Sequence, residues 1–135
     1  MSLGFGGMAR LAMQDENILI YEYAAYNLNE KECRNPDRIY DGIITICRDA
    51  LVEPEIHEKL KKMPSGRKKN IIKRIRVDVD YDSLFKNGKI IVENSKYCWK
   101  VLDHGQGIAA MKLLYIIFNR YQIEGEIPET VSAHF

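Results

Sequence analysis

The sequence predicts an α+β fold in one domain, in which a largely antiparallel, hairpin-built sheet packs on a buried C-terminal helix. Its 135 residues, 46% of them hydrophobic, suit a single domain with a core of its own. Apolar runs rich in β-branched and aromatic residues follow one another across short polar turns, which is typical of hairpins. Helices are inserted between these hairpins and after them, which favours α+β. No GxGxxG motif links a strand to a helix, so a dinucleotide-binding fold is disfavoured.

The first half of the chain is expected to form three strands. Residues 8–13 and 17–26 flank the polar turn Gln14-Asp15-Glu16 and predict a hairpin. The second run is apolar on both faces apart from Glu22, which indicates a strand covered on both sides. A polar loop follows, and residues 43–47 predict the third strand. Residues 1–7 are glycine-rich and are expected to be a flexible leader or a cloning remnant, so the domain proper is 8–135.

The middle of the chain predicts one or two short basic helices, at about 54–63 and 66–73. Pro54 suits the first helical position, and apolar residues recur at positions 56, 60 and 63. The stretch after them alternates strictly, which predicts a half-exposed strand. Its inward positions are Ile75, Val77, Val79 and Tyr81, and its outward positions are Arg76, Asp78, Asp80 and Asp82.

The last third predicts a hairpin of residues 89–93 and 97–102, followed by a buried helix at about 108–121. The helix is apolar nearly all round, which indicates burial against the sheet. The tail after Gly125 is expected to be irregular.

Charge is distributed very unevenly along the chain. Residues 59–76 contain nine basic side chains and no acidic one, although the net charge of the whole chain is only +1. Clustered cations attract phosphate backbones, so this segment is a candidate site for nucleic acid, another polyanion or an acidic protein. The simpler interpretation is a solvated surface, and the segment has no aromatic residue for base stacking. The candidate residues are Lys61, Lys62, Arg67, Lys68, Lys69, Lys73 and Arg74.

Asp78, Asp80 and Asp82 share one face of the predicted strand and form a candidate metal site. Carboxylates of this kind hold Mg²⁺ or Mn²⁺, and beside a basic segment they would suit a metal-dependent hydrolase of phosphodiesters. The simpler interpretation is the wet face of the strand, paired across the sheet with Lys89 or Lys96. Nothing in the sequence requires a cofactor.

The loop before the C-terminal helix is a third candidate. Gly105 and Gly107 precede the helix N-terminus, where free N–H groups bind anions, and His104 is an acid–base group suited to neutral pH. The simpler interpretation is a turn whose glycines satisfy the backbone.

Cellular setting follows from cysteine usage and hydropathy. Cys33, Cys47 and Cys98 are widely spaced and form no CxxC, which favours reduced thiols and a cytoplasmic location. No apolar run approaches the roughly 20 residues that cross a bilayer, so no membrane association is expected. Exposed strand edges at 8–13 or 89–93 predict a homodimer.

Three functions therefore stay open. The leading hypothesis is a small non-catalytic interaction or accessory domain, because no strong catalytic motif accompanies the core. The alternatives are a nucleic-acid-binding module that uses Lys59–Arg76, and a small hydrolase that uses the three aspartates with His104 nearby.

Overall fold

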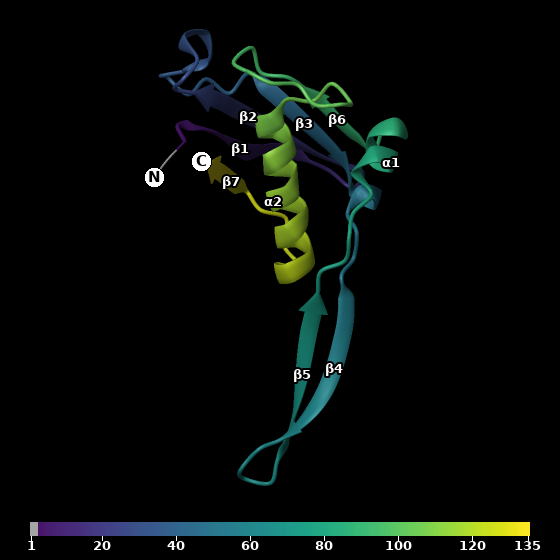
Figure 1. Cartoon of the computed structure of the whole chain (residues 1–135). Coiled ribbons are helices and arrows are strands. Elements are labelled where there is room, and N and C mark those ends of the chain that lie inside the picture. Colours follow the sequence, from purple (N-terminus) through teal and green to yellow (C-terminus); the bar gives the residue numbers. More distant parts are fainter. Residues whose placement is uncertain (1–2) are drawn as a thin grey trace.

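The computed structural model describes residues 3–135, and it has the predicted α+β architecture (Figure 1). Five antiparallel strands form a sheet in the order β6-β3-β2-β1-β7, and helix α2 crosses one of its faces. The strands are β1 (Phe5–Gln14), β2 (Ile18–Asn27), β3 (Gly42–Cys47), β6 (Ile90–Glu93) and β7 (Thr130–His134), and the helix is α2 (Ile108–Glu124). The predicted first hairpin, third strand and C-terminal helix are confirmed.

The core lies between the sheet and α2. Alternate residues of β2 and β3, such as Tyr21 and Ile44, are fully buried on the face that the helix covers. Leu113 and Phe118 meet them from the helix. The helix contacts the sheet from one side only. Tyr115 lies on its outer surface and is therefore half exposed, although most of its neighbours in the sequence are apolar and buried.

Two glycines permit close approach at this interface. A Cβ at Gly42 would lie 2.2 Å from the ring of Tyr23, so only glycine lets that ring cross the neighbouring strand. A Cβ at Gly7 would lie 3.2 Å from the Cβ of Ala109, which keeps α2 close to β1.

The two basic helices expected at about 54–63 and 66–73 are strands instead. β4 (Glu55–Lys62) and β5 (Lys68–Ile75) form an antiparallel ribbon that projects away from the body, drawn in teal in Figure 1. A spacing of four residues, as between Ile56 and Leu60, places side chains on one face of a strand as well as of a helix, so the pattern did not discriminate. The turn between the strands is closed by a 2.7 Å bond from the Met63 N–H to the Arg67 carbonyl.

The half-exposed strand expected from Ile75 to Asp82 is also wrong. Residues 76–80 lie outside any strand, and the short helix α1 (Tyr81–Lys86) begins directly after them. The carboxylate of Asp80 accepts a bond from the Ser83 N–H at 3.2 Å and so caps this helix. Side-chain exposure nevertheless alternates as expected from Ile75 to Asp82, although the backbone is not a strand. Residues 97–102 form no strand either, and they carry a single bridge from Val101 to Gly107.

The C-terminal tail is ordered rather than irregular, because β7 pairs with β1. This pairing makes residues 6–10 of β1 an interior segment, so the exposed edge expected at 8–13 is covered there. Part of the segment expected to be a flexible leader is ordered, since Phe5–Gly7 belong to β1. Met1 and Ser2 lie outside the described residues.

Candidate functional site

The β4–β5 ribbon has almost no packing against the body. None of its residues belongs to the hydrophobic core, and every position of β4 is exposed. The strand register places Lys61 opposite Lys69 and Lys62 opposite Lys68, next to the turn. Like charges directly opposite each other destabilise a sheet. Within the part of the chain that is described, none of these four lysines forms an ion pair.

The two faces of the ribbon differ in character. One face presents four lysines along its length, which are Lys59, Lys61, Lys69 and Lys73. The opposite face presents an exposed apolar row of Ile56, Ile72 and Leu60, whose exposed fractions are 53%, 60% and 65%. Lys62 and Lys68 lie on this face too, next to the turn. Acidic residues of the ribbon, Glu55 and Glu58, lie toward its root.

Arg74, one of the predicted polyanion contacts, holds the root of the ribbon to the body instead of facing solvent. Its Nε donates to the carbonyl of Gln122 at 2.8 Å and its Nη2 to that of Tyr121 at 3.4 Å. These carbonyls are at the C-terminal end of α2, where unpaired acceptors and the helix dipole favour a cation. The other six predicted contacts lie in the exposed part of the ribbon and its turn.

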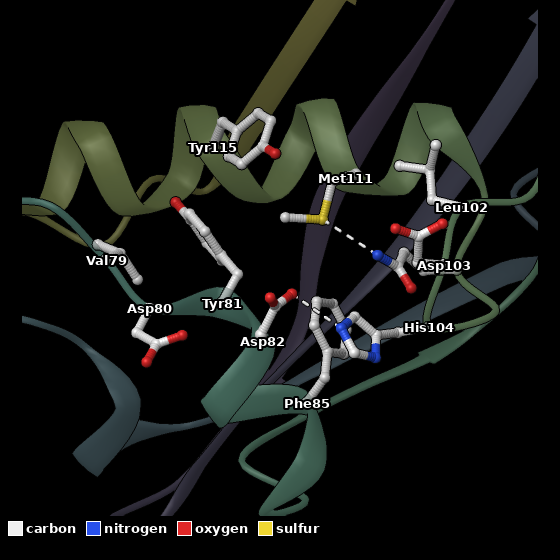
Figure 2. Close-up of a pocket in the computed structure, with 11 residues that line it drawn as sticks. Val79, Asp80, Tyr81, Asp82, Phe85, Leu102, Asp103, His104, Met111 and Tyr115 are labelled. Atoms are coloured by element: carbon white, nitrogen blue, oxygen red, sulfur yellow. Dashed lines mark hydrogen bonds and ion pairs between the residues drawn. The ribbon is translucent and has the colours of Figure 1, made fainter.

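A separate cavity of about 380 Å³ lies between α1, the loop before α2, and α2 itself (Figure 2). Asp80, Asp82 and His104 all line it, so the structure brings together three of the predicted site residues. Asp103 adds a third carboxylate. No lysine or arginine is among its lining residues in the described chain.

Asp82 and His104 form the polar contact at the mouth of this cavity. The His104 Nε2 lies 2.8 Å from the Asp82 Oδ1, and the imidazole stacks on Phe85 with centroids 5.9 Å apart. The carboxylate and the ring together fix the orientation of His104. Tyr81 and Tyr115 form an aromatic wall, with centroids 5.0 Å apart in an edge-to-face arrangement.

Gln106 supplies an unusual polar group to the same cavity. The residue is 5% exposed, and its Nε2 contacts the Met111 sulfur at 3.6 Å. Its Oε1 is buried and has no hydrogen-bond partner, the one side-chain atom in this state among residues 3–135. Buried acceptors are nearly always paired, so an orphan of this kind needs an explanation.

The three predicted metal ligands do not converge. Asp78 is exposed and does not line the cavity, and Asp80 is engaged as the cap of α1. Over the described chain, no group of three or more His, Cys, Asp or Glu is arranged to hold a metal ion. Lys89 pairs with Asp49 at 2.7 Å rather than with these aspartates, and that bond raises the pKa of Lys89.

In the predicted anion loop, the N–H groups of Gly107 and of the first helical residue already have acceptors. The Gly107 N–H donates to the Asn94 Oδ1 at 2.7 Å, and the Ile108 N–H donates to the Lys100 carbonyl at 3.0 Å. Gly105 adopts φ 87, which explains that glycine by backbone geometry.

Sequence reasoning missed Gln106, Met111 and the aromatic wall as parts of a site. Tyr81 and Phe85 are four residues apart and share a helix face, but that spacing becomes visible only once α1 is known. Nothing in the pattern distinguishes Met111 from its core neighbours.

Comparison of the chain with known protein families, curated proteins and solved structures finds no match. No helix in the described residues has the length and apolar character that spanning a membrane requires.

Proposed function

We propose that this protein is a non-catalytic nucleic-acid-binding domain that places the β4–β5 ribbon against a phosphate backbone. The observation that carries the proposal lies near the tip of the exposed ribbon, where two cross-strand lysine pairs have no acidic partner. These pairs are Lys61–Lys69 and Lys62–Lys68. Their mutual repulsion costs stability in the free protein. A polyanion removes that repulsion and releases its own counterions.

The shape of the ribbon favours duplex DNA over other polyanions. The major groove of B-DNA is about 12 Å wide and admits a two-stranded ribbon, whereas the major groove of an A-form helix is deep and narrow. Strands of eight residues extend roughly 26 Å at about 3.3 Å per residue, so the ribbon reaches across the groove from a body outside it.

The apolar row on the second face supports the same proposal. Ile56, Leu60 and Ile72 are exposed beside the cations, and Pro64 lies in the turn. In the major groove, apolar side chains beside cations contact the methyl groups of thymine. An acidic protein surface would have less use for cations on both faces.

The remaining alternatives have weaker support. For the hydrolase, the ribbon projects away from the cavity that holds Asp80 and His104, so a phosphate bound at Lys68 would not reach those groups (Figure 1). The three cysteines are free thiols, which fits a reducing compartment such as the cytoplasm. A homodimer would have three surfaces to use, which are the edge strands β6 and β7 and the sheet face opposite α2.

The test is binding of a fluorescent 20-base-pair DNA duplex, followed by anisotropy between 50 and 200 mM salt. Binding should weaken steeply as salt rises. In the double variant K61Q/K69Q, the slope of log K against log salt should fall by about 1.8, because each phosphate contact contributes about 0.9. The matched control is K31Q/K100Q, which removes two exposed lysines of the body and should leave the slope unchanged.

Two results would overturn the proposal. One is equal binding by the parent and K61Q/K69Q. The other is an affinity for poly-glutamate that matches the affinity for the duplex at the same salt, which would indicate an acidic polypeptide as the partner.

A further inference from the structure

We propose that the cavity beside α1 binds an organic cation, a primary ammonium or guanidinium group carried on a short apolar stem. This site is separate from the ribbon and does not rest on nucleic-acid binding. Its volume of about 380 Å³ falls in the range of small-ligand sites.

The charge of the lining selects a cation. Asp80, Asp82 and Asp103 contribute three carboxylates, and the imidazole of His104 is already engaged with Asp82. No basic side chain other than that imidazole lines the cavity within residues 3–135. An anion placed here would face these carboxylates without a counterion, so the cavity disfavours it.

Gln106 supplies the second and independent indication, because it needs a hydrogen-bond donor. A thioether sulfur only accepts, so the Nε2 of Gln106 must face Met111 and the Oε1 must remain the free end. That oxygen is buried and unpartnered. An ammonium or guanidinium carries several N–H donors, enough to pair with this oxygen and with one of the carboxylates that line the same cavity.

The aromatic wall completes the recognition. Tyr81, Phe85 and Tyr115 line the cavity, and cations bind over aromatic faces. The same rings offer apolar surface to the ligand stem. A metal ion would use none of this wall, and the described residues offer it no group of three ligands.

The test is calorimetric titration of the full chain with butylguanidinium and with butylammonium at constant ionic strength. Butanol and pentanoate are the neutral and anionic controls of the same stem length. Both cations should bind, and neither control should. A third ligand is blocked arginine, N-acetyl-arginine methylamide. If it binds, an arginine side chain of a peptide can supply the cation. If it does not bind while butylguanidinium does, the site is restricted to small molecules.

Two variants separate binding from folding. D82N should weaken cation binding about tenfold or more, because it removes a charged acceptor. D78N, an exposed aspartate outside the cavity, is its matched control and should bind like the parent. Q106M removes the orphan oxygen, so it should keep or raise the melting temperature while it weakens binding.

The opposite directions of these two Q106M effects would not arise from a purely structural glutamine. Equal binding of butanol and butylguanidinium would overturn the proposal. So would cation affinities that D82N and Q106M leave unchanged.

Discussion

Buried polar residues hold the irregular parts of this protein in place, and Asn35 is the clearest case. It is 1% exposed and adopts φ 44, a left-handed conformation that asparagine tolerates. Its Nδ2 donates to the carbonyls of Ala25 and Ile39 at 2.9 and 3.2 Å, and its Oδ1 accepts from the Ile39 N–H at 2.8 Å. One side chain thus attaches the long loop after β2 to the sheet.

We predict that N35A lowers the free energy of unfolding by roughly 2–3 kcal/mol, because buried backbone groups lose their partners. Urea unfolding followed by circular dichroism measures this loss. N119A, at an exposed position of α2, is the control and should change stability by less than about 0.5 kcal/mol. Equal losses in the two variants would contradict the role given to Asn35.

Tyr23 links the core to alkaline stability. Burial raises its pKa to about 12, whereas a phenol in the unfolded chain titrates near about 10. The unfolded state therefore releases its proton first, so stability is fully present below about pH 10 and falls as pH rises toward about 12. The loss is on the order of 2–3 kcal/mol for a shift of about two units.

Y23F should separate the two roles of this phenol. Its oxygen accepts a bond from the Ser95 N–H at 3.0 Å, so the variant should be about 1 kcal/mol less stable at pH 7. It should then lose less stability than the parent between pH 10 and 12. Urea midpoints at several pH values give both quantities, and parallel curves for parent and variant would exclude Tyr23 as a cause of the alkaline loss.

At the scale of elements, the ribbon is positioned by its root. Gln122 is 1% exposed, and its side-chain amide pairs with both backbone groups of Val77, as a neighbouring strand would. Its Oε1 accepts from the Val77 N–H at 2.7 Å, and its Nε2 donates to the Val77 carbonyl at 3.1 Å. Arg74 donates to carbonyls at the end of the same helix. The exit from β5 is therefore fixed to α2 by side chains rather than by core packing.

We expect Q122L to cost roughly 2 kcal/mol, since two backbone groups lose their partners while the volume of the side chain is kept. The amide of Val77 should also exchange with deuterium faster in Q122L than in the parent. I123L, at the adjacent half-exposed position, provides the control. Unchanged exchange at Val77 would mean that the root is held by other contacts.

Elements that are buried in the core could be predicted from the sequence, and the ribbon could not. The β1–β2 hairpin has a polar turn between two apolar runs, and α2 has apolar residues over several turns. In both cases the local sequence pattern and the packing in the core favour the same secondary structure. Residues 55–75 have no core contact to impose a period, and their four-residue spacing fits strand and helix equally. Periodicity also cannot show a capping bond, so the alternation around Asp80 gave no sign that this residue caps a helix.

At the scale of the whole molecule, the candidate cavity is a product of assembly. From the sequence, Asp80 and Asp82 were predicted as metal ligands and His104 as an acid–base group in an anion loop, and an organic cation was not considered. The partners that change this interpretation come from three separate segments: Phe85 on α1, Gln106 in the loop, and Tyr115 on α2. Only the packing of α1 against α2 brings them together, and no local pattern encodes that contact.

The whole molecule also divides into a body with a core and a ribbon without one, which predicts that the ribbon is dispensable for folding. We expect a chain in which residues 57–73 are replaced by Asn-Gly, a dipeptide suited to a two-residue hairpin turn, to fold. Ile56 and Arg74 are paired in the register, so the short turn joins residues that already lie opposite each other. Arg74 and Gln122 then keep their contacts at the root.

This shortened chain tests both proposals in one molecule. The replacement removes seven basic side chains and one acidic one, and so takes the net charge from +1 to −5. Duplex binding should be lost, because a chain of that charge repels phosphate. Binding of butylguanidinium should persist, because every lining residue of the cavity lies outside the replaced segment. Thermal unfolding should remain cooperative, with a midpoint close to that of the parent.

Two outcomes would contradict these expectations. A shortened chain that fails to fold would show that the ribbon stabilises the body. A shortened chain that still binds duplex DNA would show that the nucleic-acid site is not on the ribbon.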